Sequence, residues 1–187
     1  MSIPACSRRR LLRVGLVTST GLAALNLGVT SARGGPDPDQ ELLRQALADE
    51  QALVLAYAAA LGRGVLARPA HRVLRHIREQ EIEHAQGLLT ALREQGDRAP
   101  PAPSRNAPDG LLPGLARARS PHNLLSYLLE LESVVVRRHA QRVQRLVDDG
   151  LIRTNASVLA NEAQHLTVLR ELLGVEPLGV ALELGRG

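Results

Sequence analysis

Four segments of this chain have apolar residues at the spacing of one helix face, and a glutamate lies near the middle of each of these apolar stripes. Two of these glutamates begin the motif Glu-x-x-His. The motifs are EIEH at 81–84 and EAQH at 162–165. Residues three apart share one face of an α-helix, so the Glu and the His of each motif aim at one point. The motifs begin 31 residues after Glu50 and 30 residues after Glu132. The repeated spacing therefore predicts two equivalent halves.

Four segments show the apolar period of a helix, and we find no segment with the alternation of a strand. Pro, Asp and Gly residues mark their ends, as they do where helices begin and stop. We expect helices over residues 39–62, 69–95, 121–149 and 155–173. Gly150 is the expected stop of the third helix, and Thr154 or Asn155 is the expected cap of the fourth. Residues 96–121 are too rich in proline for a long helix and unusually long for a loop.

The stripe glutamates need compensation if they face the interior of a bundle, because burying an unpaired charge costs several kcal/mol. The stripes contain almost no Arg, but they contain His. Carboxylates and imidazoles that converge in an apolar core suit a divalent metal ion. Other charged residues fall on the outer faces, where we expect solvent; these include Glu79, Glu83, Glu130, Arg137, Arg138, Arg142 and Arg145.

The residues that are absent exclude other kinds of site. The sequence has no Lys, which excludes a P-loop lysine and Schiff-base chemistry. Its one cysteine, Cys6, precedes the apolar part of the N-terminus. If that segment is removed, no thiolate metal site, disulfide or Cys nucleophile remains. Glu, Asp and His are then the side chains that could hold a metal.

The N-terminus reads CSRRRLLRVGLVTSTGLAALNLGVTSARGG. A basic cluster, a short apolar stretch and small residues before a cleavage point predict an export signal over residues 1–32. It resembles a twin-arginine signal, with Arg8 and Arg9 as the pair, and an ordinary secretory signal is the alternative. The resemblance implies the twin-arginine export machinery as a partner. It places the chain in the periplasm, the cell envelope or the medium, with the signal removed or retained as an anchor.

Cleavage after Ala32 would also change the charge of the chain. Four of the 23 basic residues and no acid would leave, so the formal net charge would fall from +4 to zero. The sequence contains no Trp and no Phe, and its two Tyr residues are Tyr57 and Tyr127. A neutral chain without aromatic platforms is not expected to bind nucleic acid. A linker over 33–38 would then lead into one domain.

These residues resemble the ferritin-like superfamily, in its carboxylate-bridged di-metal branch. Such sites take one Glu from each of two helices and Glu-x-x-His from each of the other two. The resemblance covers residues 39–174, and residues 175–187 form a tail. It implies an all-α four-helix bundle with a long crossover between helices 2 and 3. The metal ligands implied are Glu50, Glu81, His84, Glu132, Glu162 and His165.

The resemblance also implies how the ligands are shared. Glu81 and Glu162 would bridge two metals, and each of the other four would bind one. Tyr57 and His139 each follow the first Glu of their half by seven residues. We expect the Tyr57 hydroxyl to bond a ligand carboxylate, because a buried Tyr needs a partner. His139 is expected beside the ligands or simply in the core.

The implied cofactor is a pair of iron ions, or manganese, that reacts with O2 or peroxide in a ferroxidase-, oxidase- or peroxidase-like role. Two other functions stay open. One is a non-enzymatic exported bundle that acts as an interaction or envelope protein, with a structural metal or none. The other is iron storage by cage assembly, which size-exclusion chromatography would separate from a monomer or homodimer.

Overall fold

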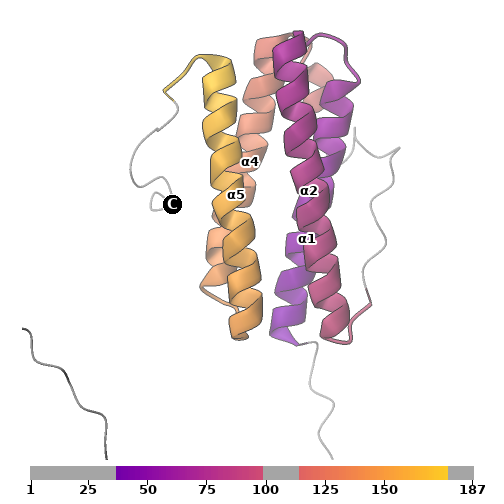
Figure 1. Ribbon diagram of the computed structural model, residues 1–187, viewed down its shortest axis with the longest axis vertical. Coiled ribbons are helices and arrows are strands. Elements are labelled where there is room, and N and C mark those ends of the chain that lie inside the picture. Colours follow the sequence, from indigo (N-terminus) through magenta and orange to yellow (C-terminus); the bar gives the residue numbers. More distant parts are fainter. Residues whose placement is uncertain (1–36, 99–113, 177–187) are drawn as a thin grey trace, which may run out of the picture. The chain divides into compact units, whose positions relative to one another are not determined.

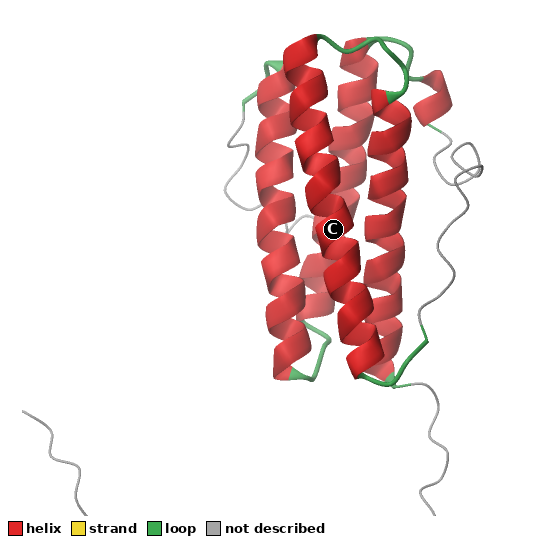
Figure 2. Cartoon of the chain, turned by 45° about the vertical axis from the view of Figure 1, so that its right-hand side comes forward, coloured by secondary structure: helices red, strands yellow, loops and turns green. Residues whose placement is uncertain are grey.

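The computed structural model describes residues 37–98 and 114–176, which form a bundle of four long helices (Figures 1 and 2). Its elements are α1 (Pro38–Leu61), α2 (Arg68–Glu94), the short 3-10 helix η1 (Leu115–Arg117), α4 (Pro121–Val143) and α5 (Asp149–Leu173). The described part of the chain contains no strand, so the predicted all-α class is confirmed. The predicted signal over 1–32 lies outside the described residues, as does most of the predicted tail.

Two of the helices begin as their sequences predict. A side-chain oxygen of Asp37 accepts from the backbone N–H of Asp39 at 2.9 Å, directly before Pro38 in the first turn of α1. Ser120 caps α4 in the same way, and Pro121 follows it. The cap satisfies an N–H that has no partner within the helix, and proline in the first turn loses no bond.

The junction between α4 and α5 differs from the prediction. Helix α4 ends at Val143 and α5 begins at Asp149, so the predicted ends at residues 149 and 155 are wrong. The Asp148 side chain accepts from the N–H of Leu151 at 2.9 Å. The run Asp148 to Gly150 is therefore a helix start, although its glycine reads as a stop.

A contact with the beginning of α1 holds this junction in place. The Asp39 carboxylate accepts from the backbone N–H groups of Val147 and Asp148, at 2.9 to 3.1 Å. These groups are more than a hundred residues from Asp39 in sequence. Local sequence patterns could not have shown this contact.

The ends of the central connection lie at opposite ends of the bundle. At one end, the Gln40 side chain donates to the backbone carbonyl of Gln95, just after α2. At the other end, Arg63 follows α1 and donates to the carbonyl of Ala116 in η1. The chain must therefore travel the length of α2, about 40 Å for 27 residues at 1.5 Å each, before α4 begins. Figure 1 shows the end of α2 and the start of α4 at opposite ends of the bundle, as the predicted crossover requires.

The apolar core has two parts. One cluster includes Leu53, Leu74, Ile77, Leu124, Leu128 and Leu169. The other includes Leu42, Leu43, Leu47, Leu88, Leu92, Leu146 and Leu151. The four stripe glutamates lie between these two clusters along the bundle. Apolar side chains therefore shield the glutamates from both ends.

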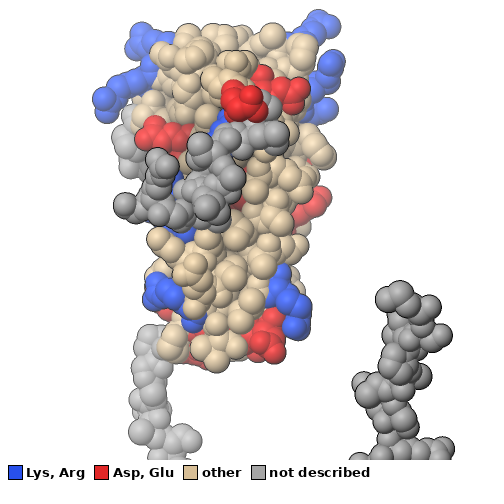
Figure 3. Space-filling model, turned by 90° about the vertical axis from the view of Figure 1, so that its left-hand side faces the viewer, with Lys and Arg blue, Asp and Glu red and all other residues tan. Residues whose placement is uncertain are grey.

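The surface in Figure 3 carries both signs of charge toward each end of the bundle, so no single-sign patch covers that face. None of the described helices combines the length and apolarity needed to cross a membrane.

Candidate metal centre

Each of the four long helices contributes one glutamate to the interior. All four are fully buried, at 0% exposure: Glu50 on α1, Glu81 on α2, Glu132 on α4 and Glu162 on α5. Their neighbours Glu79, Glu83 and Glu130 are exposed, as predicted. A helix turns its side chains by about 100° per residue, so residues two apart face nearly opposite directions. The helical phase of each stripe thus decides which glutamate is buried.

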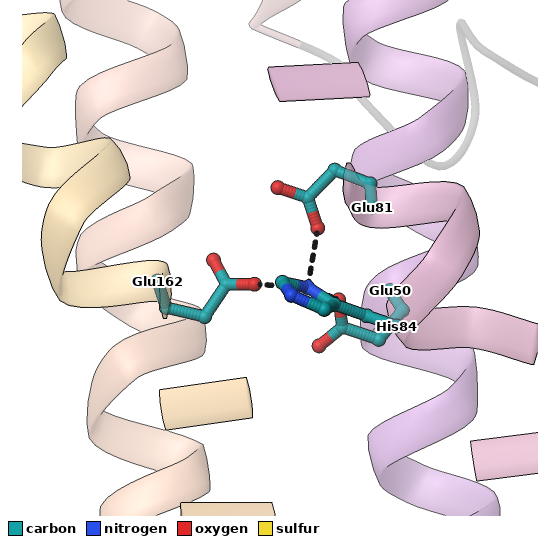
Figure 4. A group of neighbouring side chains, drawn as sticks. All are labelled: Glu50, Glu81, His84 and Glu162. Carbon is teal, nitrogen blue, oxygen red and sulfur yellow. Dashed lines mark hydrogen bonds and ion pairs between the residues drawn. The ribbon is translucent and has the colours of Figure 1, made fainter. Parts of the chain in front are cut away.

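The first group of candidate ligands surrounds His84. Its Nδ1 atom lies 2.8 Å from Glu162 Oε1, 3.3 Å from Glu50 Oε2 and 3.5 Å from Glu81 Oε2. Figure 4 shows the Glu162 carboxylate reaching from α5 toward His84 and Glu81, which project from α2. One ligand atom from each of these four residues fits within 4.8 Å of all the others.

The second group surrounds His165. Its Nδ1 atom lies 2.8 Å from Glu81 Oε1, 3.4 Å from Glu162 Oε2 and 3.7 Å from Glu132 Oε1. Glu81 and Glu162 therefore belong to both groups, and each turns one oxygen toward His84 and the other toward His165. The structure brings all six predicted residues together in two overlapping sets. A carboxylate that bridges two metals would present its oxygens in this way.

Several buried ligand atoms have no hydrogen-bond partner of acceptable geometry among the described residues. They are both oxygens of Glu81, both of Glu162, Oε2 of Glu132 and Nδ1 of His165. Imidazole and carboxylate atoms approach within 2.8 Å, but their orientations do not make hydrogen bonds. Polar atoms left in this state cost free energy unless something else binds them. A cation between the groups would satisfy them, so the donor set fits a metal.

Burial makes two of the carboxylates hard to ionise. Burial raises the pKa of Glu81 to about 7, and the nearby imidazoles of His165 and His84 only partly oppose it. The pKa of Glu132 is raised well above its usual value, first by burial and then by the charge of Glu162. The charged form of an acid is disfavoured by low polarity and by a like charge nearby.

The imidazoles hold protons for the opposite reason. Burial alone would lower the pKa of His84, but ion pairs with Glu162, Glu50 and Glu81 raise it to about 12. The same balance, with Glu162 and Glu81 as the partners, raises the pKa of His165 to about 9. The pKa values of Glu50 and Glu162 are lowered, because the contacts with imidazoles outweigh their burial. Protons on this cluster supply the positive charge that a metal would otherwise supply, so metal binding must displace them.

Tyr57 and His139 each contact a glutamate of the opposite half of the chain. The Tyr57 hydroxyl on α1 donates a short hydrogen bond to Oε1 of Glu132 on α4. His139 Nε2 on α4 lies 2.6 Å from Oε1 of Glu50 on α1. The two residues at the seven-residue spacing therefore make equivalent contacts in the structure. Each contacts the glutamate of the neighbouring helix rather than the glutamate of its own helix.

Asn155 is a part of this centre that the sequence did not indicate. His139 Nδ1 donates to Asn155 Oδ1 at 2.8 Å, and Asn155 Nδ2 donates to the backbone carbonyl of His139 at 3.0 Å. Asn155 is fully buried in α5 and does not cap the helix. It precedes Glu162 by seven residues on the same stripe, and this spacing could have identified it.

Gln80 also orients a candidate ligand. His165 Nε2 donates to Gln80 Oε1 at 3.0 Å. When the ring loses its second proton to bind a metal, this bond keeps the remaining proton on Nε2 and leaves the lone pair on Nδ1. Histidine ligands of metals commonly donate their second ring N–H to such a partner. Nothing in the spacing of Gln80 pointed to this contact, because it joins two different helices.

Arg142 is not on the solvated face where it was predicted. It is only 5% exposed, and its guanidinium pairs with Asp49 on α1 through a short contact. Arg138 lies 2.5 Å from the other oxygen of the same carboxylate. The prediction failed because Asp49, beside Glu50, packs against α4 and draws the Arg142 side chain inward.

Comparison with known proteins identifies a family and a fold. A sequence profile described as "Ferritin-like domain" matches residues 24–175. The crystal structure of the hypothetical protein MJ0754 from Methanococcus jannaschii DSM 2661 is similar, with a TM-score of 0.67 and 11% identity over 83% of this chain and 97% of that one. At that identity the likeness shows the fold alone. No curated protein matches the chain.

Proposed function

The chain belongs to the ferritin-like family, and on this basis we propose that its bundle binds two iron or manganese ions and uses them in a redox reaction with O2 or peroxide. One observation carries the proposal. Two buried donor groups overlap, and Glu81 and Glu162 turn separate oxygens toward each group. A structural site for a single metal needs only one such group.

The donor atoms suit these metals. His84 and His165 would each supply one imidazole nitrogen, Glu50 and Glu132 would each supply a carboxylate to one ion, and Glu81 and Glu162 would be shared. A mixture of imidazole and carboxylate without thiolate favours iron or manganese over metals that prefer sulfur. When bound, two such ions would supply the electrons that reduce O2 or peroxide.

Other residues of the chain would prepare this site. The hydrogen bond from Tyr57 orients Glu132, and the chain of Asn155 and His139 orients Glu50. Ligands held in place before the metal arrives lose less freedom on binding. The two apolar clusters exclude water from above and below, which strengthens electrostatic interactions inside.

Anaerobic titration with Fe(II), followed by oxygen, tests the proposal. We expect two Fe(II) per chain, and an absorbance change when oxygen is added. Glu81→Gln should reduce the stoichiometry, because it weakens a donor in both groups, whereas Glu83→Gln on the exposed face should leave it unchanged. Zero metal in the parent protein would favour a non-enzymatic bundle. Metal without any response to oxygen or peroxide would favour a structural role, and a cage-sized mass would favour storage.

We also propose that the protein is exported by the twin-arginine route. Arg8 and Arg9 support this, although they lie outside the described residues. That route carries folded cargo, so the metal could be loaded before export. Replacing both arginines by Lys should leave folded protein in the cytoplasm, as measured by cell fractionation. Unchanged export of the double variant would rule out this route.

A further inference from the structure

The six candidate ligands differ in their access to solvent. The side chains of the four glutamates are 0% exposed, and that of His165 is 2% exposed. The His84 side chain is 12% exposed. A reactant that enters the cluster from the side of His84 therefore has the fewest protein atoms to displace. The two histidines are thus equivalent in sequence but not in the folded protein.

A polar groove between α2 and α5 ends at His84. Its cavity of about 650 Å³ is lined from α2 by Gln80, His84 and Gly87 and from α5 by Ser157 and Asn161, among others. Hydroxyl and amide groups on its walls can replace water around a hydrated ion. We call this cavity the α2–α5 groove.

The cavity beside His165 is smaller than the α2–α5 groove. A separate cavity of about 350 Å³ lies beside His165, and Val73, Ile77 and Val168 line it together with polar side chains such as Arg72 and Gln164. Gln80 binds the outer nitrogen of His165 there. The three aliphatic side chains cannot hydrogen-bond a hydrated ion, so an ion that loses water against them loses free energy of hydration.

We propose that the α2–α5 groove is the route by which hydrated metal ions and small polar oxidants such as hydrogen peroxide reach the carboxylate cluster, and that Gly87 keeps this route open. The inference rests on the proposed metal site and adds the path by which that site is filled.

Gly87 matters because of where a side chain at this position would lie. It follows His84 by three residues, so both share one face of α2. Helical side chains lean toward the N-terminus and cover the preceding turn, so a leucine at position 87 would lie over His84. A Cβ atom added at Gly87 meets nothing within 4 Å. Glycine within a helix is less favourable than Leu or Ala by up to about 1 kcal/mol, so this position carries a cost in helix stability.

The test measures metal exchange rather than turnover. Co(II) uptake by the metal-free protein is followed by its visible absorbance in a stopped-flow instrument, and its release is followed after adding excess chelator. Gly87→Leu should slow both rates by about tenfold or more, since it raises the barrier between two unchanged end states. The equilibrium dissociation constant should therefore stay the same. Oxidation of the Fe(II)-loaded variant by hydrogen peroxide should slow to a similar extent.

Matched variants separate blockage from other effects. Gly87→Ala adds only a methyl group and should keep the parent rates. Ala48→Leu adds a similar bulk on the opposite side of the bundle, where Ala48 lines a cavity between α1 and α4, and should also keep them. Ser157→Leu closes the groove from its α5 wall and serves as a second block if Gly87→Leu misfolds.

The outcomes distinguish this inference from the proposed function. If the parent protein takes up no Co(II), the metal site itself is refuted. If the parent takes up Co(II) and both blocking variants exchange it at the parent rates, the route is refuted while the site stands. Slowing by Ala48→Leu alone would place the route between α1 and α4 and also overturn the inference.

Discussion

Replacing Glu81 by Gln keeps the shape of the side chain and removes a charge that the folded protein disfavours. Burial raises the pKa of Glu81 from 4.5 to about 7. The folded state therefore holds this proton more tightly than the unfolded state does. As pH rises above about 4.5, ionisation increasingly favours unfolding, and this loss of stability levels off once pH passes about 7. The glutamine variant has no such loss.

The pKa shift sets the size of the effect. One pKa unit corresponds to about 1.4 kcal/mol, so the shift from 4.5 to about 7 corresponds to about 3 kcal/mol once the group is ionised in both states. Without metal, the Glu81→Gln variant should be more stable than the parent by that amount near pH 8 and by about 1 kcal/mol near pH 5. For a domain of this length, the gain near pH 8 raises the melting temperature by roughly 10 °C.

Thermal unfolding followed by circular dichroism measures these changes. Samples with a chelator at the two pH values give the metal-free stabilities, and samples with Mn(II) give the effect of metal. A metal at one hundred times its dissociation constant adds about 2.7 kcal/mol to the parent. The Glu81→Gln variant should lose most of this gain, because both donor groups lose a carboxylate oxygen.

Glu83→Gln is the control, since Glu83 is exposed on the same helix. This change should alter the free energy of unfolding by no more than about 0.5 kcal/mol at either pH, and it should keep the response to Mn(II). The reasoning fails if the two variants have equal metal-free stabilities near pH 8. It also fails if the melting temperature changes neither when metal is added to the parent nor when Glu81 is replaced. Glu81 would then behave as a residue in water.

Three further predictions concern the same cluster. Metal must displace protons from Glu81 and His165, whose pKa values are about 7 and about 9, so Mn(II) affinity measured by calorimetry should increase from about pH 6 to about pH 9; a flat profile would contradict proton displacement. Tyr57→Phe removes the donor to Glu132 and should lower the free energy of unfolding in urea by about 1 to 3 kcal/mol; an unchanged midpoint would show that this bond contributes nothing. Glu132→Ala should lower the bound metal by one ion per chain in metal analysis, and Glu130→Ala should not; equal losses would mean that the helix phase is wrong.

Local pattern was enough to decide which glutamates are buried. Glu81 and Glu83 are two residues apart, and Glu132 and Glu130 likewise, so each pair points to opposite sides of its helix. The apolar residues one turn away show which side faces the core. This information lies within a single helix, and the structure agrees with it.

Local pattern failed where a distant residue decides the outcome. Gly150 reads as a helix stop, but Asp148 caps a new helix there and Asp39 holds the turn from the far end of the sequence. Arg142 reads as a surface residue, but Asp49 of another helix pairs with it. Both errors come from contacts between helices, which the period of one helix cannot contain.

The sequence by itself determined the four helices, the four interior glutamates and the duplicated Glu-x-x-His, because these depend on spacing along one chain segment. The tertiary structure alone decided which groups meet. Tyr57 supports Glu132 and His139 supports Glu50 because α1 and α4 pack side by side, so each glutamate is nearest to the neighbouring helix's residue. It also decided that His84 opens onto a groove while Gln80 covers His165, since both depend on how α2 packs against α5.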